Sequence, residues 1–259
     1  MIVDANVSLS RWPFRRLVGD ETPELVRRLR KRGVAQVWAE NFDGILHKDV
    51  GGVNARLAAE CRTHGKDFLV PFGTVNPKLP DWQEDLRRCQ EDYRMPGIRL
   101  HPNYHGYDLR EPVFRELLNL AAERRLIVQL AVCMEDERTQ HPLIRVPPVD
   151  CAPLPELLKR DPALRLVLIN CDPAIRQGLL QPVLSAGGAY CDISMVEGIE
   201  GVARLVERVS PKKVLFGSNS PLFYFESALL KIQETGLSES EKDALLEGNA
   251  RQLLAPVAS

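Results

Sequence analysis

Short apolar segments alternate with longer amphipathic segments along the whole chain. Each apolar segment is rich in Val, Ile, Leu and Phe and is bounded by polar or turn-forming residues, as expected for a strand of a parallel sheet. Eight such segments are found, at residues 1–6, 35–40, 68–75, 97–102, 126–132, 164–170, 189–194 and 213–219.

The segments between them carry apolar residues at three- and four-residue spacing, which indicates amphipathic helices. Pro23 and Pro112 lie in a first helical turn, where proline is accepted. Gly33 and Gly65 lie where a helix would end. The helical patterns cover 22–33, 53–65, 112–125, 153–161, 175–187 and 199–209. Eight strand–helix units in a chain of about 250 residues predict a (β/α)8 TIM barrel, with residues 1–259 forming a single domain.

Composition narrows the classes of function. The chain of 259 residues is 44% hydrophobic and 27% charged, with a net charge of -1, which gives no sign of a nucleic-acid partner. No apolar run approaches the roughly 20 residues that span a bilayer. The N-terminal residues also lack a basic segment followed by an apolar signal core. We therefore expect a cytoplasmic protein that binds neither nucleic acid nor membrane.

The C-terminal ends of the strands are where a barrel of this kind places its active site. Asn6 and Ser8 are two residues apart, so on an extended strand they point in the same direction. The polar residues expected at this end are mostly amides and hydroxyls: Asn6, Ser8, Glu40, His101, Asn103, Glu135, His141, Asn170, Ser194 and Asn219.

Four segments resemble the amidohydrolase superfamily, specifically its amidohydrolase-2 branch of small TIM barrels. IVDANVS (2–8) resembles the IDxHxH of the first strand, and GIRLHPNYHGYDL (97–109) resembles the fourth-strand segment. VLFGSNSP (214–221) resembles the FGSDxP of the eighth strand, and EGNARQLL (247–254) resembles the GNAxRLL of the C-terminal helix. The resemblance implies a hydrolase-type barrel that normally depends on a metal ion.

The same resemblance implies five metal-ligand positions, and this sequence departs from the family at each of them. In place of four histidines and an aspartate the chain has Asn6, Ser8, Ala131 (or Gln129 in a register shifted by two), Asn170 and Asn219. Neutral amide and hydroxyl oxygens are poor zinc ligands. Loss of the aspartate also removes a charge that balances a dication. We therefore expect no catalytic metal and no other cofactor at these positions.

Other residues of the expected site can support chemistry without a metal. A histidine beside carboxylates is a plausible general acid or base, so the candidate catalytic residues are His101, His141 and Glu135. Arginine binds carboxylates through paired hydrogen bonds. The candidate substrate-binding residues are Asn6, Ser8, Trp12, Arg99, Asn103, Arg138, Asn170 and Asn219.

Aromatic residues follow the first and last strands. SRWPFRR (10–16) combines Trp12 and Phe14 with arginines, which suits a lid over an anionic ring compound or a subunit contact. SNSPLFYFESALL (218–230) places three further aromatic residues near the same end of the barrel.

Several interpretations remain open. The protein is either a hydrolase that cleaves a lactone, ester or amide of a small anionic substrate without metal, or a catalytically inactive barrel that binds a ligand or acts as a scaffold. A catalyst should direct an oriented histidine at an open pocket, whereas a scaffold can fill that pocket with side chains. A relocated metal site would use His101, His141 and Glu135 or Asp136. A homodimer is compatible with each interpretation.

Overall fold

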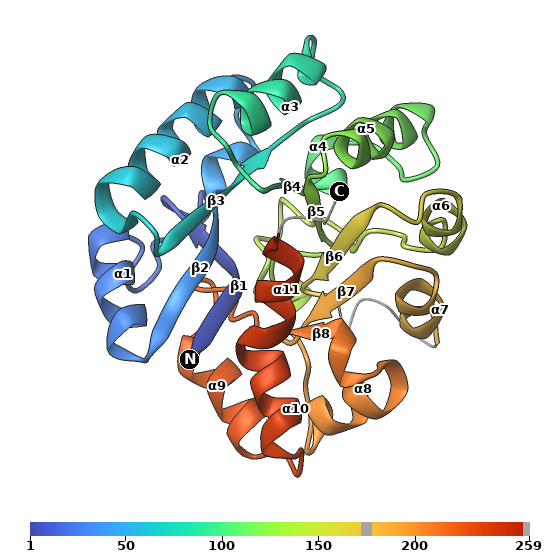
Figure 1. Ribbon diagram of the computed structural model, residues 1–259. Coiled ribbons are helices and arrows are strands. Elements are labelled where there is room, and N and C mark those ends of the chain that lie inside the picture. Colours follow the sequence, from blue (N-terminus) through green and yellow to red (C-terminus); the bar gives the residue numbers. More distant parts are fainter. Residues whose placement is uncertain (172–177, 256–259) are drawn as a thin grey trace.

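The strands of the sheet follow one another in the order of the sequence. The computed structural model describes residues 1–171 and 178–255 (Figure 1). Within these residues each strand pairs in parallel with the next. The strands are β1 (Ile2–Leu9), β2 (Val34–Asn41), β3 (Leu69–Thr74), β4 (Gly97–Leu100), β5 (Ile127–Ala131), β6 (Arg165–Ile169), β7 (Ala189–Asp192) and β8 (Val214–Leu215). All eight strands expected from the apolar segments are confirmed.

The last strand returns to the first and closes the sheet. The backbone N–H of Ala5 donates to the carbonyl of Phe216 at 2.9 Å, and that of Ser8 donates to the carbonyl of Ser220 at 2.8 Å. The strand β8 ends at Leu215, and the N–H groups beyond it have other acceptors. That of Phe216 donates to the carbonyl of Leu245 at 2.9 Å, and that of Ser218 donates to the side chain of Asp4 at 3.0 Å. The predicted (β/α)8 TIM barrel is therefore confirmed.

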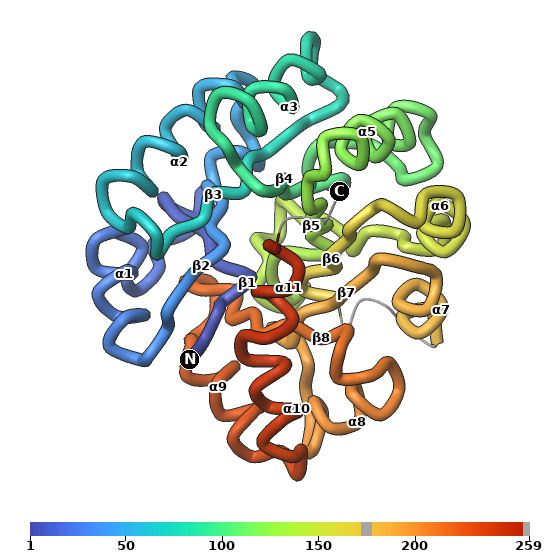
Figure 2. Tube along the Cα trace, viewed as in Figure 1, coloured from blue at the N-terminus to red at the C-terminus, as the bar shows by residue number. Residues whose placement is uncertain are grey.

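Helices surround the barrel, and the colours of Figure 2 show the chain passing once around it. They are α1 (Thr22–Lys31), α2 (Val50–Gly65), α3 (Trp82–Glu91), α4 (Pro102–His105), α5 (Pro112–Glu123), α6 (Leu154–Arg160), α7 (Leu180–Ser185), α8 (Gly201–Val209), α9 (Phe225–Gln233), α10 (Glu239–Asp243) and α11 (Asn249–Leu254), with short turns η1 (Phe42–Ile45), η2 (Glu137–Thr139), η3 (Pro211–Lys213) and η4 (Ala244–Gly248). Residues 175–177 of the predicted helix 175–187 lie outside the described residues. No helix within the described ranges is long and apolar enough to cross a membrane.

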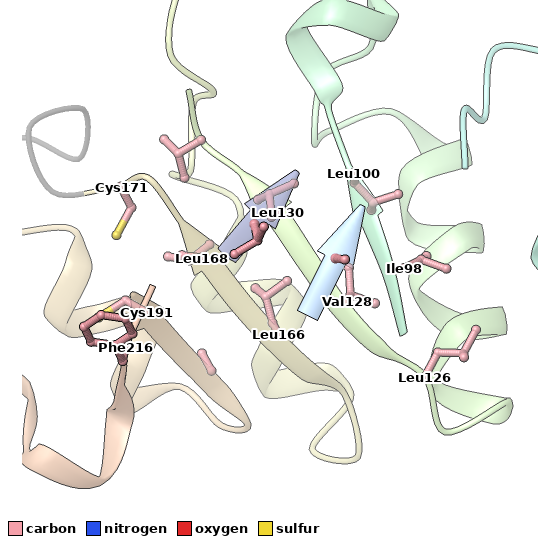
Figure 3. Close-up of a cluster of buried hydrophobic side chains, with 14 of the residues drawn as sticks. Ile98, Leu100, Leu126, Val128, Leu130, Leu166, Leu168, Cys171, Cys191 and Phe216 are labelled. Carbon is pink, nitrogen blue, oxygen red and sulfur yellow. The ribbon is translucent and has the colours of Figure 1, made fainter. Parts of the chain in front are cut away.

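The main apolar core lies between the strands and the helices. Figure 3 shows side chains from β4, β5 and β6 in this core, among them Ile98, Leu100, Val128 and Leu130. Side chains alternate between the two faces of a strand. The residues between these apolar positions, such as Arg99 and Gln129, therefore point into the barrel.

A second apolar cluster runs through the inside of the barrel. Trp38 and Phe72 stack there with ring centroids 4.9 Å apart. At the N-terminal end of the strands the cluster includes Leu253 of α11, which crosses the ring of strands in Figure 1. The amino group of Met1 pairs with Glu247 at the same end. Since α11 covers this end, a functional site belongs at the opposite end, where the strands finish.

Candidate functional site

A buried ionic network fills one side of the C-terminal end of the barrel. Ser8 and Glu40 face each other on β1 and β2, and the Ser8 hydroxyl donates to Glu40 Oε1 at 2.9 Å. His101 Nε2 lies 2.8 Å from Glu40 Oε2, and Arg99 Nη1 lies 3.4 Å from Glu40 Oε1. Arg99 Nε also donates to Gln129 Oε1, directly across from it on β5, at 2.8 Å. The side chains of Glu40, Arg99 and His101 have no solvent exposure.

The neighbours of Glu40 keep its carboxylate ionised. Burial alone would raise the pKa of this carboxyl group, but the charges of His101 and Arg99 and the hydrogen bonds from His101 and Ser8 lower it to about 2. Burial lowers the pKa of Arg99 below its ordinary value, and the charge of Glu40 opposes that change. The network is therefore a buried group of compensating charges.

A second buried network joins β1, β6 and β7. Asn6 Nδ2 donates to Asn170 Oδ1 at 2.8 Å and to Asp192 Oδ2 at 2.7 Å. The Ser194 hydroxyl lies 2.7 Å from Asn170 Oδ1 and 3.1 Å from Asp192 Oδ1. Asn170 takes a left-handed backbone conformation with φ 58°, which Asn adopts more readily than most residues. Asn6 and Ser8 thus belong to different networks, and the register of β1 against β2 shifts between Asp4 and Val7.

Two buried carboxyl groups in this region have raised pKa values. Burial raises the pKa of Asp192 to about 6, although hydrogen bonds from Asn6, Asn170 and Ser194 act in the opposite direction. Burial likewise raises the pKa of Asp4 to about 7 against hydrogen bonds from Ser218 and Asn6. Asp192 is not among the site residues predicted from the sequence. Its position, an acidic residue at the end of an apolar strand, could have identified it.

Aromatic and apolar residues cover both networks at the C-terminal end. Trp12 is 2% exposed and packs edge-to-face on Phe42 and Phe14, with ring centroids 5.1 and 5.2 Å apart. Trp12, Met134 and Leu222 belong to the same apolar cluster as the barrel interior. Ser194 of the second network nevertheless lines a cavity at the side of this cluster.

The remaining predicted residues lie in the loops above the strands. Glu135 is almost fully buried and pairs with Arg15 at 2.5 Å, which joins the loop after β5 to the loop after β1. Asn219 donates to the carbonyl of Met134 at 3.1 Å, and its Oδ1 is buried without a hydrogen-bond partner in the described structure. Asn103 donates to the carbonyl of Pro147.

The two predicted catalytic histidines occupy different environments. His101 is enclosed and bonded to Glu40, whereas His141 is exposed in the loop after β5 and accepts from the N–H of Leu143. Arg138 is 81% exposed and pairs with Asp136. Among the described residues no hydrogen bond or ring contact joins His101 to His141. Their roles as an acid–base pair therefore remain predictions.

A cavity of about 900 Å³ lies beside the covered centre. Cys133 and Glu135 line it from the loop after β5, Ser194 from the end of β7, and Phe223 and Lys231 from the β8 side. Lys231 Nζ donates to the carbonyl of Ser194 at 2.7 Å. Burial raises the pKa of the Cys133 thiol to about 12, which makes it a poor nucleophile. Ser194 links this cavity to the network of Asp192.

The side chains at the five family positions do not fit a catalytic metal. Ala131 has no donor atom, and Asn219 offers only a neutral amide oxygen. Asn6 directs its amide protons, and not an oxygen lone pair, at Asn170 and Asp192. Ser8 donates to Glu40, and Gln129 is held between Arg99 and the carbonyl of Ala5. In the part of the chain that the structure describes, no three His, Cys, Asp or Glu side chains come together as metal ligands. The alternative site of His101, His141 and Glu135 or Asp136 is thus not assembled there.

Comparison with known proteins decides the family. A family model described as Amidohydrolase matches residues 13–255. The chain belongs to the amidohydrolase family. The resemblance to the amidohydrolase-2 branch is thereby confirmed, and no curated protein sequence matches the chain significantly.

Solved structures of low sequence identity share the fold of this amidohydrolase-family barrel. A 5-carboxyvanillate decarboxylase from Sphingomonas paucimobilis has 13% identity and a TM-score of 0.76, with 98% of each chain covered. A 2,6-dihydroxybenzoate decarboxylase from Rhizobium has 12% identity and a TM-score of 0.72, again with 98% of each chain covered. A 4-oxalomesaconate hydratase from Rhodopseudomonas palustris has 16% identity and a TM-score of 0.68, with 98% of this chain and 95% of that chain covered.

The buried carboxyl groups predict a pH dependence of stability. The pKa values of Asp192 and Asp4 in the folded protein are about 6 and about 7, against an ordinary value of 3.8. Between pH 3.8 and these values, the folded protein therefore binds more protons than the unfolded chain. Their contribution is fully present below pH 3.8 and is lost as the pH rises through 6 and 7. The free energy of unfolding in urea should fall from pH 5 to 7.5, by up to roughly 1.4 kcal/mol per pH unit for each proton.

Asp192→Asn removes one of these two titrating groups and should flatten the slope. The control is Glu207→Gln, which changes an exposed residue of α8 and should leave the slope unchanged. If Asp192→Asn had the same slope as the parent protein, Asp192 would not carry a proton in the folded protein over this pH range.

Proposed function

We propose that this amidohydrolase-family barrel holds no catalytic metal and binds a small organic molecule in the cavity beside the barrel centre. The polar side chains at the strand ends bond to one another, as Asn6 does to Asn170 and Ser8 to Glu40. The cavity lies beside them, where Ser194 lines its wall. This arrangement supports the proposal. A catalyst of the kind first expected would direct His101 at an open pocket. His101 is instead enclosed.

The lining of the cavity suits a small organic ligand. Its volume falls in the range of ligand pockets. Its lining combines apolar side chains, such as Met195, Val196 and Phe223, with more numerous polar and charged ones. Lys231 would bind the negative charge of the expected anionic ligand, since the charge of Arg138 is already compensated by Asp136. The exposed Glu137 and Glu197 line the same cavity, so we propose a ligand with no more than one negative charge.

Ligand binding can be tested by blocking the cavity. Ser227 is an exposed residue of α9 on the cavity wall, and Ser227→Trp would fill part of the space. In a thermal-shift screen of small ring compounds, binders should raise the melting temperature of the parent protein, since a ligand at 100 times its Kd adds about 2.7 kcal/mol of stability. The same compounds should not shift Ser227→Trp.

The matched control is Ser185→Trp, which adds the same side chain at an exposed position on α7 outside the cavity. Binders that shift Ser227→Trp as strongly as Ser185→Trp would place the ligand site elsewhere.

Ser194 supports a second candidate, metal-independent hydrolysis of an ester or lactone. Ser194 lines the cavity, and its hydroxyl lies 3.1 Å from Asp192 Oδ1. The pKa of Asp192, about 6, allows this carboxylate to accept a proton near neutral pH. Ser194 Oγ would bond to the substrate carbonyl carbon as its proton passes to Asp192. Asp192 would return that proton to the departing alcohol oxygen, and water would then release the acid from Ser194.

Hydrolysis has a direct test. On this second candidate the purified protein should hydrolyse 4-nitrophenyl acetate or dihydrocoumarin in the presence of a chelator, and Ser194→Ala should lower the rate at least about a hundredfold. Ser227→Ala, on the same cavity wall, should keep most of the rate. A rate that Ser194→Ala leaves unchanged would exclude this candidate and leave ligand binding as the proposal.

A further inference from the structure

A second groove with a different lining lies between α1 and the segment that follows β8. Its volume is about 250 Å³, and it is separate from the larger cavity except that Phe223 lines both. The polar lining is strongly biased: four arginines, Arg15, Arg16, Arg28 and Arg32, face a single carboxylate, Glu226.

Three of these arginines already have carboxylate partners. Arg32 pairs with Glu226 at 2.6 Å, which neutralises the carboxylate of the groove. Arg16 makes two hydrogen bonds of 2.8 Å to Asp20, and Arg15 pairs with Glu135. Each of these carboxylates compensates the charge of one arginine.

Arg28 differs from the other three in its partners. Its Nη1 donates to the backbone carbonyl of Val18 at 3.1 Å, and among the described residues no carboxylate lies within ion-pair distance of it. Residue 19 leaves room for this guanidinium, because a Cβ on Gly19 would lie 2.4 Å from Arg28 Nη1. One hydrogen bond to the backbone therefore places this guanidinium beside the groove, with donor groups still available.

Apolar and aromatic side chains supply the rest of the groove. Leu25 and Leu29 of α1 line it and are buried, as is Leu222. Phe223 and Tyr224 also line the groove, and Tyr224 is 67% exposed. A cavity of about 150 Å³ holds benzene, so a groove of about 250 Å³ has room for one ring and a small charged group.

We propose that this groove is a second binding site, specific for a small aromatic carboxylate, whose anionic group pairs with Arg28 and whose ring packs on Tyr224. Arginine binds a carboxylate through two parallel hydrogen bonds. The ring adds apolar contact that inorganic anions lack. The site does not depend on the larger cavity or on hydrolysis.

The test uses benzoate as the probe in a titration followed by ligand-observed NMR, with benzamide as the neutral ligand of the same shape. Benzoate should bind more tightly than benzamide. Arg28→Met should weaken benzoate binding at least about tenfold, because it removes a charge-assisted pair of hydrogen bonds.

Matched controls distinguish this groove from the larger cavity and from a general effect of positive charge on α1. Arg27→Met removes a neighbouring charge of α1 that does not line the groove, and it should leave binding unchanged. Equal weakening by Arg27→Met, or equal binding of benzamide and benzoate, would overturn the proposal. Binding that is lost in Ser227→Trp but kept in Arg28→Met would also overturn it, and would assign benzoate to the larger cavity.

Discussion

The buried carboxylate of Glu40 is the interaction on which the C-terminal end of the barrel depends. It lies between Arg99 and His101 and accepts from Ser8, so it connects β1, β2 and β4, while Gln129 extends the contact to β5. Removing one partner of a buried ion pair leaves a charge without compensation, at a cost of about 3–5 kcal/mol. Turning Arg99 or His101 toward a ligand would therefore break this buried pairing.

This constraint explains the division between a filled centre and open spaces around it. The amide of Asn6 donates to the side-chain oxygens of Asp192 and Asn170. These buried acceptors thus have hydrogen-bond partners within the protein. Trp12 and Met134 then cover the polar layer with apolar surface. The space available to ligands lies to the side, where Ser194 reaches the larger cavity, and between α1 and the segment after β8. The chain thus keeps the family fold while its centre is occupied by its own side chains.

Much of the fold could be predicted from the sequence because its signals are local. Apolar runs predict every strand found in the described residues. Segments such as 97–109 and 214–221 resemble the amidohydrolase-2 branch, and the family match agrees with this resemblance. The site was less predictable because its contacts join residues far apart in the chain. Glu135 is paired with Arg15, and Asp192 is bonded to Asn6, across separations of 120 and 186 residues.

Local conformation set a second limit on prediction. Asn6 and Ser8 were expected to share a site because they are two residues apart, but the register of β1 shifts next to them and they join different networks. Trp12, which stays a predicted substrate-binding residue, packs against Phe42 and Phe14. Neither outcome can be derived from strand periodicity alone, since both depend on how the neighbouring loops and strands pack.

We propose that hydrogen-bonded amides replace the metal ligands implied by the resemblance to the amidohydrolase-2 branch. The most direct measurement is elemental analysis of protein purified without chelator, before and after incubation with zinc and manganese followed by desalting. We expect metal far below one equivalent per chain in both samples, because neutral amide oxygens bind these ions weakly. A stoichiometric metal that is lost in Asn6→Ala or Asn170→Ala would contradict it.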